Sequence, residues 1–211
     1  MSDYFFEDED LYQITTEYDD CSIDVIYNIK MAEERIFYVD KDIDKSILLL
    51  QKQIVYINLE DSKNGIPREK RKPIKILIDS YGGYLSSSMS LAVTIKQSIT
   101  PVWTINIANA MSGGAIILIS GHKRFALPYS KAMIHTGSNE FGGTYEQVME
   151  QVTKYKNDIH EMCDYILNNT TIDLDTYNAN KAKDWYLSDE DQVNNGLVDE
   201  IVDNIFALLE V

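Results

Sequence analysis

Basic residues are scarce in this chain of 211 residues, in which 34 acidic side chains outnumber 19 basic ones and leave a formal net charge of −15. Nucleic-acid binding depends on lysine and arginine, which displace the counterions of the phosphates. The sequence therefore predicts neither general nucleic-acid binding nor attachment to anionic membranes. A basic cluster at 68–72 follows Gly65 and Pro67, and this pattern is typical of a solvated loop.

Long apolar runs and cysteines are few as well. No run approaches the ~20 apolar residues that a membrane-spanning helix needs, and the first ten residues lack the basic and apolar segments of a signal peptide. Cys21 and Cys163 form no C-x-x-C pair and have no histidine at metal-ligand spacing. We therefore expect free thiols in a reducing compartment and a cytoplasmic protein.

Two regions differ in their sequence patterns. Residues 1–20 are acidic, contain scattered aromatic residues and have no periodicity, which predicts a flexible N-terminal arm. Residues 21–211 are long enough for one domain, in which short strands alternate with helices. This alternation implies βαβ units and a largely parallel sheet, the α/β class. We predict strands at 74–79, 102–107, 124–127 and 132–135, helices at 45–57, around 91–99 and at 115–120, and a loop at 61–72.

The clearest periodicity lies between residues 145 and 166, where apolar residues recur alternately after three and four positions. Thr144 and Gln147 form a capping box at its start. The pattern predicts a helix of more than twenty residues with a narrow apolar stripe. Such a stripe needs a partner helix, either within the subunit or between subunits.

One acidic motif resembles the beginning of a calcium-binding loop. Its aspartates are Asp40, Asp42 and Asp44, but the sixth position is Lys45 instead of glycine and the twelfth is Gln51 instead of glutamate. A calcium loop needs the glycine for its turn and the glutamate as a bidentate ligand. We therefore expect no metal site here.

Two glycine turns follow two of the predicted strands, and both have features that acyl transfer requires. Gly82 and Gly83 let a ligand approach the backbone, while Ser112, followed by Gly113, lies at a strand-to-helix junction that exposes its hydroxyl. Free backbone N–H groups at such a junction favour a developing negative charge. The arrangement resembles the nucleophile elbow of hydrolases, although the glycine before the serine is absent. A turn residue or helix cap fits the same pattern.

A serine nucleophile needs a base within hydrogen-bond reach, usually a histidine. The chain has three histidines. His160 falls in a polar part of the long predicted helix and His122 falls in a turn. His135 ends an apolar segment and suits a strand end at the rim of a sheet, although a structural histidine fits that position as well. The acid cannot be selected in this way, because 34 carboxylates are available.

Several motifs in a fixed order resemble the ClpP family of proteolytic subunits. The family has a serine in an A-S-x-G-A context, then K-R-x-x-L-P-x-S and M-I-H, and further on D-x-[FY]-[LM]-S and G-L-[VI]-D. The resemblance spans about residues 21 to 203. The matching segments are Ala110-Met-Ser-Gly-Gly-Ala115, Lys123-Arg-Phe-Ala-Leu-Pro-Tyr-Ser-Lys-Ala-Met-Ile-His135, Tyr186-Leu-Ser188 and Asn195-Gly-Leu-Val-Asp199.

The resemblance implies a role for five residues. Ser112 matches the nucleophile, His135 the base and Asp184 the acid that orients this base. Gly83 and Gly113 match the positions whose backbone N–H groups form the oxyanion hole. The implied activity is that of a serine endopeptidase with a Ser-His-Asp triad.

The resemblance also implies a fold and partners. It predicts a ClpP/crotonase-like α/β fold of repeated ββα units, with a long protruding helix after His135 that joins two stacked heptameric rings into a tetradecamer. A hexameric AAA+ unfoldase of the Clp type would dock on this barrel and feed it unfolded polypeptides. The partner consumes the ATP, so no cofactor is expected in the subunit itself.

The chain departs from the family pattern near these motifs. Tyr81 replaces the proline before the glycine pair, Gly113 replaces a bulkier residue, and Thr136-Gly137 replaces Gln-Pro after the histidine. Lys75 and Leu77 replace aromatic residues on the strand before the glycine pair, which changes the usual surface for docking the unfoldase. These differences indicate a divergent member.

Three other functions fit parts of the pattern. A catalytically silent ring subunit would keep the fold without the chemistry. A Ser-Lys peptidase resembling signal peptide peptidase would use Lys123 or Lys131 as its base. A crotonase-type acyl-CoA enzyme would share the fold and the paired oxyanion N–H groups, but it would not require serine, histidine and aspartate together.

Overall fold

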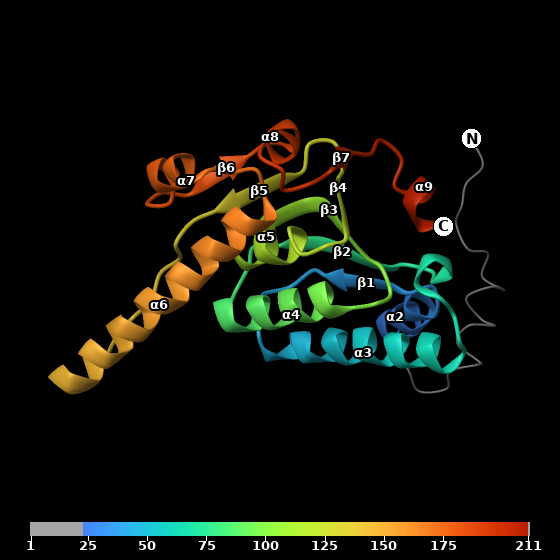
Figure 1. The fold of residues 1–211 in the computed structure, drawn as a ribbon, viewed down its shortest axis with the longest axis horizontal. Coiled ribbons are helices and arrows are strands. Elements are labelled where there is room, and N and C mark those ends of the chain that lie inside the picture. The colour runs from blue at the N-terminus through green and yellow to red at the C-terminus, as the bar shows by residue number, and fades with distance from the viewer. Residues whose placement is uncertain (1–22, 211) are drawn as a thin grey trace.

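The computed structural model describes residues 23–210, which form one α/β unit around a seven-stranded sheet (Figure 1). The predicted N-terminal arm at 1–20 and Cys21 lie outside the described residues. The strands are β1 (Ile36–Val39), β2 (Ile74–Ser80), β3 (Val102–Met111), β4 (Lys123–Ala126), β5 (Lys131–Ile134), β6 (Trp185–Leu187) and β7 (Glu200–Ile201). The helices are α2 (Ile23–Glu33), α3 (Leu48–Lys63), α4 (Leu85–Gln97), α5 (Gly113–Leu118), α6 (Tyr145–Asn169), α7 (Leu174–Asn180), α8 (Asp189–Asn194) and α9 (Phe206–Leu209), with short 3-10 helices η1 (Lys45–Ile47) and η2 (Arg68–Lys70).

The sheet is parallel except for one pair of strands, which confirms the predicted class. Its main order is β1-β2-β3-β4-β7, and β5 pairs with the end of β3 and, antiparallel, with β6. The long strand β3 therefore pairs with β4 through its first half and with β5 through its second half. This division directs the end of β3 toward β5 and β6.

Both faces of the central strands are covered, which explains the nearly continuous apolar sequence of β2. Its isoleucines pack into the larger core, on the face of the sheet that α3, α4 and α5 cover. Leu77 packs on the other face with Leu208 of α9. Lys75 is fully buried on β2, where burial lowers its pKa and its Nζ donates to the carbonyl oxygen of Leu209 at 2.7 Å. The C-terminal segment thus closes the second face of the sheet.

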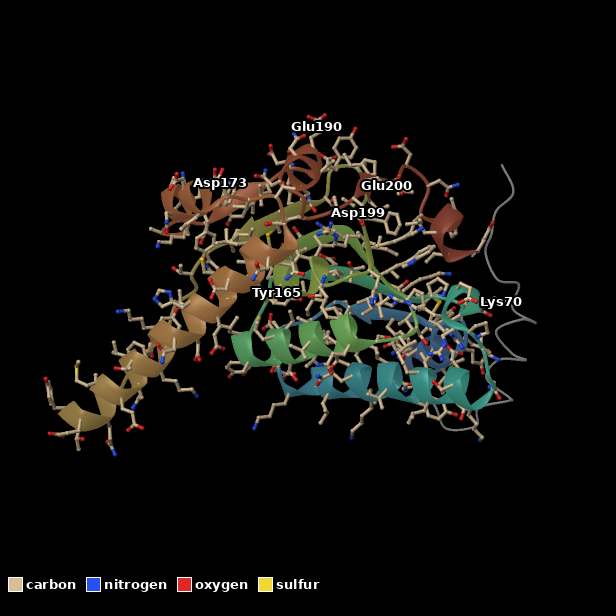
Figure 2. The ribbon with its side chains drawn as sticks, viewed as in Figure 1. Lys70, Tyr165, Asp173, Glu190, Asp199 and Glu200 are labelled. Carbon is tan, nitrogen blue, oxygen red and sulfur yellow. The ribbon has the colours of Figure 1, made fainter. Side chains whose placement is uncertain are left out.

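Helix α6 is the predicted long helix, and it leaves the body of the molecule at its N-terminal half (Figure 1). The predicted capping box is confirmed at Thr144 and Gln147. Met162 and Ile166 are buried in the core, whereas Tyr145 is 75% exposed. Tyr165, labelled in Figure 2, lies on the packed half of the helix. Its hydroxyl is 2.8 Å from the Ser120 hydroxyl. The apolar stripe is therefore covered over only part of its length in this subunit.

Several predicted boundaries were wrong; the strand predicted at 102–107, for example, continues to Met111 as β3. The helix predicted at 45–57 continues to Lys63, so it includes the beginning of the predicted loop at 61–72, and η2 lies within the rest of that loop. Ile99 does not belong to α4, because the helix ends at Gln97 and Ile99 is 53% exposed. Pro101 disfavours helical geometry at Thr100, the residue before it. The Ile99 N–H donates to the Asn58 side chain and not to a carbonyl of the helix.

Acidic side chains extend along the edge of the molecule formed by α7, α8 and β7 (Figure 2), among them Asp173, Glu190 and Glu200. None of the helices within residues 23–210 is long and apolar enough to cross a membrane.

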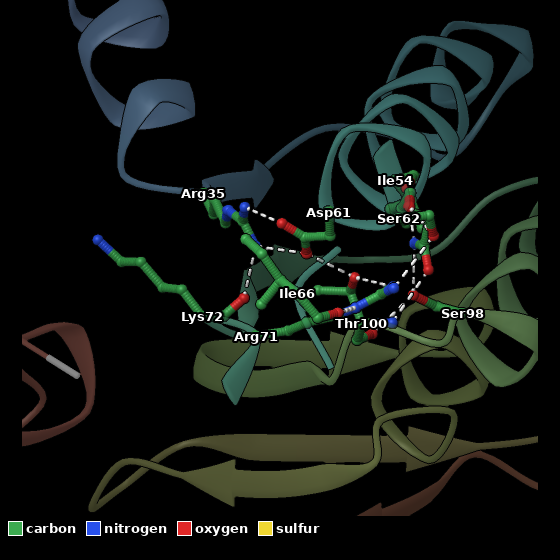
Figure 3. A network of polar contacts seen from close by, with 10 residues as sticks. Arg35, Ile54, Asp61, Ser62, Ile66, Arg71, Lys72, Ser98 and Thr100 are labelled. Atoms are coloured by element: carbon green, nitrogen blue, oxygen red, sulfur yellow. Dashed lines mark hydrogen bonds and ion pairs between the residues drawn. The ribbon is translucent and has the colours of Figure 1, made fainter. Parts of the chain in front are cut away.

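A buried polar network links the end of α3 to the segments that lead into β1, β2 and β3 (Figure 3). Asp61, which is 1% exposed, accepts two hydrogen bonds from the Arg35 guanidinium at 2.6 and 2.9 Å and one from the Thr100 hydroxyl at 2.8 Å. Arg71 donates to Thr100 and Ser62 from the other side. Every oxygen of this buried carboxylate therefore has a donor.

Replacing Asp61 with alanine is expected to lower the free energy of unfolding by about 3–5 kcal/mol, because it leaves the largely buried Arg35 guanidinium without its anion. Glu60→Ala is the control on the same helix. Its pair with Lys63 is exposed, so the expected loss is only about 0–1 kcal/mol. Urea unfolding at neutral pH measures both values, and equal losses would contradict this account of the network.

The stability that Asp61 contributes is also expected to depend on pH. Burial alone would raise its pKa, but the hydrogen bonds from Arg35 and Thr100 outweigh burial and hold the pKa below the ordinary value of 3.8. The folded state thus binds this proton less readily than the unfolded state. The contribution is complete above pH ~4 and is lost as pH falls through the folded pKa. Unfolding curves of the wild type and Asp61→Ala should therefore converge in acid.

Candidate active site

Ser112 lies where β3 ends and α5 begins. Its N–H donates to the carbonyl oxygen of Met133 at 2.8 Å, which extends the β3–β5 ladder by one bond and fixes the serine beside β5. The backbone of Ser112 has φ 52° and ψ −114°. A non-glycine residue with positive φ is strained, and such strain occurs at sharp strand-to-helix turns that expose a nucleophile. The local geometry therefore matches the predicted junction.

The antiparallel pairing of β5 with β6 brings the other two candidates together. Met133 is opposite Tyr186, and Ile134 is opposite Trp185. In this register the next pair is His135 with Asp184. The acid is 49 residues away in sequence, yet the strand pairing places it directly beside the histidine.

The three side chains form one continuous chain of hydrogen bonds. His135 Nε2 lies 2.9 Å from Ser112 Oγ, and His135 Nδ1 lies 3.0 Å from Asp184 Oδ1. With its proton on Nδ1, the imidazole donates to Asp184 and its Nε2 accepts from the Ser112 hydroxyl. Ser112 and His135 are half-buried, whereas the Asp184 side chain is 56% exposed. The site thus opens to solvent on the side of the carboxylate.

Gly82 packs against Ser112 and Gly113, and the next residue, Gly83, is held by a backbone bridge to Ile43. The Ile43 N–H donates to the Gly82 carbonyl oxygen, and the Tyr84 N–H donates to the Ile43 carbonyl oxygen. The N–H of Gly83 takes no part in this bridge. A Cβ at Gly83 would overlap the backbone of Ile43, and its φ of +153° also requires glycine. The close approach of these two backbone segments explains the glycine.

Gly113 begins α5, where backbone N–H groups have no partner within the helix. Its φ does not require glycine, but a Cβ at this position would overlap the hydroxyl of Ser88 on α4. The Ser88 Cβ would be 3.3 Å away, which is tighter than an ordinary contact and needs a shift of only a few tenths of an ångström. Ser88 therefore explains why this chain has glycine where the resembling family has a bulkier residue.

Gly113→Ala is accordingly expected to lower the free energy of unfolding by about 1–3 kcal/mol through overpacking. Adding Ser88→Ala should recover most of this loss, because it removes the overlapping hydroxyl. Chemical unfolding of both single variants and the double variant measures the coupling between the two positions. Strictly additive losses would contradict the proposed contact.

An apolar pocket adjoins the serine. It is lined by Ser112 and His135 together with six apolar residues of α5 and the residue after it, of β5 and of α6, namely Ala115, Ile116, Ile119, Ile134, Met162 and Ile166. The pocket places apolar surface beside the nucleophile, which favours contact with an apolar group of a substrate over a charged one. Helix α6 thus contributes directly to the wall of the site.

The other candidate bases and nucleophiles lie elsewhere. His122 Nδ1 accepts a hydrogen bond from the Val102 N–H, and burial lowers its pKa. His160 is exposed on α6. Lys123 lies over the ring of Trp103 near the start of β3, roughly 30 Å along that strand from Ser112 at the usual rise per residue. Burial raises the pKa of Cys163, which disfavours its thiolate.

Lys131 begins β5 opposite Asn109, and it is exposed. The last aspartate of the acidic motif at residues 40–44 has a structural role, because the Asp44 carboxylate accepts a hydrogen bond from the Ser46 N–H and caps the start of η1. Within residues 23–210, no three His, Cys, Asp or Glu side chains are grouped closely enough to hold a metal ion.

The protein thus has a mainly parallel α/β sheet with a serine, a histidine and an aspartate aligned at its rim. This is the side-chain arrangement of the serine hydrolases. Comparison with known proteins makes this more specific. The profile of the family described as Clp protease matches residues 19–205. The ATP-dependent Clp protease proteolytic subunit 3 of Synechococcus sp. (strain CC9902) is 30% identical over 181 residues, which cover 82% of this chain and 84% of that relative. The chain therefore belongs to the Clp protease family, as a divergent member.

Proposed function

We propose that this chain is a serine endopeptidase subunit of a Clp-type protease, with Ser112 as nucleophile, His135 as base and Asp184 as the acid that orients the base. The observation that carries the proposal is the continuous hydrogen-bonded chain from Ser112 Oγ through both imidazole nitrogens to Asp184 Oδ1. A silent subunit would not need this alignment, which costs backbone strain at Ser112.

The reaction proceeds in two halves. Ser112 Oγ attacks the peptide carbonyl carbon while His135 Nε2 takes the hydroxyl proton, and Asp184 stabilises the resulting imidazolium. The N–H groups of Gly83 and Gly113 donate to the oxyanion. The C–N bond then breaks as His135 returns the proton to the leaving amine. In the second half His135 takes a proton from water as the water attacks the ester carbon, and it then returns this proton to Ser112 Oγ as the acyl group leaves. These steps need no cofactor in the subunit.

Assembly into two stacked heptameric rings is part of the proposal. Support comes from α6, whose N-terminal half protrudes with Tyr145, Met149 and Val152 exposed. An apolar stripe of this kind is favourable only when another surface covers it, and the same stripe of a facing subunit is a suitable partner. A hexameric AAA+ unfoldase that uses ATP would supply unfolded polypeptides to the enclosed sites.

Hydrolysis of a short fluorogenic peptide with leucine or methionine before the scissile bond tests this function. We expect His135→Ala to abolish hydrolysis by the purified protein, and Lys131→Ala and Lys123→Ala to leave it within about twofold of the wild type. Loss of activity in a lysine variant alone would favour the Ser-Lys mechanism instead. A wild type that assembles, as measured by native mass, but does not hydrolyse peptides would be a silent ring subunit.

A further inference from the structure

The residue that follows His135 is held from two sides. The Thr136 N–H and hydroxyl both donate to the carbonyl oxygen of Lys181, each at 3.2 Å. The Tyr155 hydroxyl of α6 donates to the carbonyl oxygen of Thr136 at 2.9 Å. We call these three residues, Tyr155, Thr136 and Lys181, the Thr136 bridge. It connects α6, the end of β5 and the segment between α7 and β6.

Two members of this bridge, Thr136 and Lys181, lie close in sequence to the two residues whose alignment the chemistry needs. Thr136 follows His135 directly, and Lys181 lies three positions before Asp184. The Asp184 side chain is mostly exposed and bonds to His135, so its backbone must fix its direction. The bridge supplies that restraint just beyond the last β5–β6 pair, Ile134 with Trp185.

Tyr155 is suited to this task by its place on α6. It is half-buried where the helix leaves the body, and its ring packs edge-on against Phe141 at 5.7 Å between centroids. This contact directs the hydroxyl toward the strand end. Farther along the helix, Tyr165 makes a similar hydroxyl contact with Ser120, but that contact does not involve the segments of His135 or Asp184.

We propose that Tyr155 and Thr136 are positioning residues, which hold His135 and Asp184 in hydrogen-bond register and thereby set the rate of the chemical step. The proposal rests on the proposed function of the same site. Misplacing a catalytic group by about 1 Å can cost up to about a hundredfold in rate. A bridge that restrains both segments should therefore affect kcat much more than KM.

Tyr155→Phe removes the hydroxyl and keeps the ring. In the full-length protein we expect kcat for the fluorogenic peptide to fall roughly ten- to a hundredfold, with KM and native mass unchanged. Thr136→Val should also lower kcat, because it loses the hydroxyl donor, whereas Thr136→Ser should retain wild-type kcat. Tyr165→Phe is the matched control, since it removes a hydroxyl contact of the same helix, and its kcat should equal that of the wild type.

Hydrogen exchange measured by mass spectrometry provides a second readout that does not require activity. Exchange at 135–137 and 181–185 should accelerate in Tyr155→Phe and remain unchanged in Tyr165→Phe. Unchanged exchange in Tyr155→Phe would overturn the inference. Faster exchange in Tyr155→Phe together with a wild-type kcat would also overturn it. So would a loss of kcat in Tyr165→Phe equal to that in Tyr155→Phe. A wild type without hydrolysis would instead refute the proposed function, while the exchange data would still decide whether the bridge holds these segments.

Discussion

Replacement of Ser112 by alanine is expected to lower kcat for peptide hydrolysis by about 10⁶-fold, because the attacking oxygen is lost while the rest of the site remains. The native mass should not change. Ser112 lies at the junction of β3 and α5, and its backbone bond to Met133 uses the N–H group, which alanine retains. Alanine also tolerates the positive φ about as poorly as serine does, so the fold should have similar stability.

Ser86→Ala is a suitable control for this change, since Ser86 is an exposed serine on α4. Its kcat should equal that of the wild type. Steady-state hydrolysis with the same fluorogenic peptide measures both variants, and native mass spectrometry measures their assembly. Activity of Ser112→Ala within tenfold of the wild type would exclude this serine as the nucleophile.

Asp184→Asn is expected to lower kcat by roughly 10⁴-fold with little effect on KM. The amide nitrogen of asparagine would donate to His135 Nδ1 and favour the tautomer with its proton on Nε2. In that tautomer Nε2 cannot accept the proton of Ser112. The variant keeps the size of the side chain and the β5–β6 pairing that positions it, so the loss reports on the tautomer and not on folding.

Asp175→Asn controls for the removal of one negative charge, because Asp175 is exposed on the neighbouring helix α7. Its kcat should be unchanged. A similar loss in both variants would mean that the general field of the acidic edge, and not the bond to His135, supports activity. An Asp184→Asn variant with wild-type kcat would remove Asp184 from the proposed triad.

The local parts of this fold were predictable from the sequence because their signals are local. The apolar run of β2, the glycine turn after β3 and the spacing of α6 each identify an element without reference to the rest of the chain. Ser112 and His135 could be selected as candidates for the same reason. Each lies at a recognisable boundary of a strand or helix.

The remaining parts depend on contacts between distant segments. Asp184 joins His135 through the pairing of β5 with the three-residue strand β6, and the sequence pattern did not identify so short a strand. The resemblance to a family indicated the acid where periodicity could not. Gly113 is explained by Ser88 on another helix. The polar Lys75 interrupts an apolar strand, yet it is buried because the C-terminal segment supplies the Leu209 carbonyl as an acceptor.

Covalent labelling of the wild-type protein with a fluorophosphonate, followed by peptide mapping in a mass spectrometer, tests most directly whether Ser112 is the nucleophile. An activated serine oxygen attacks phosphorus and displaces fluoride, so the adduct identifies the nucleophile. We expect one adduct per chain, on Ser112, formed rapidly by the wild type and not detectably by His135→Ala. An adduct on another residue, or labelling that does not depend on His135, would contradict this assignment.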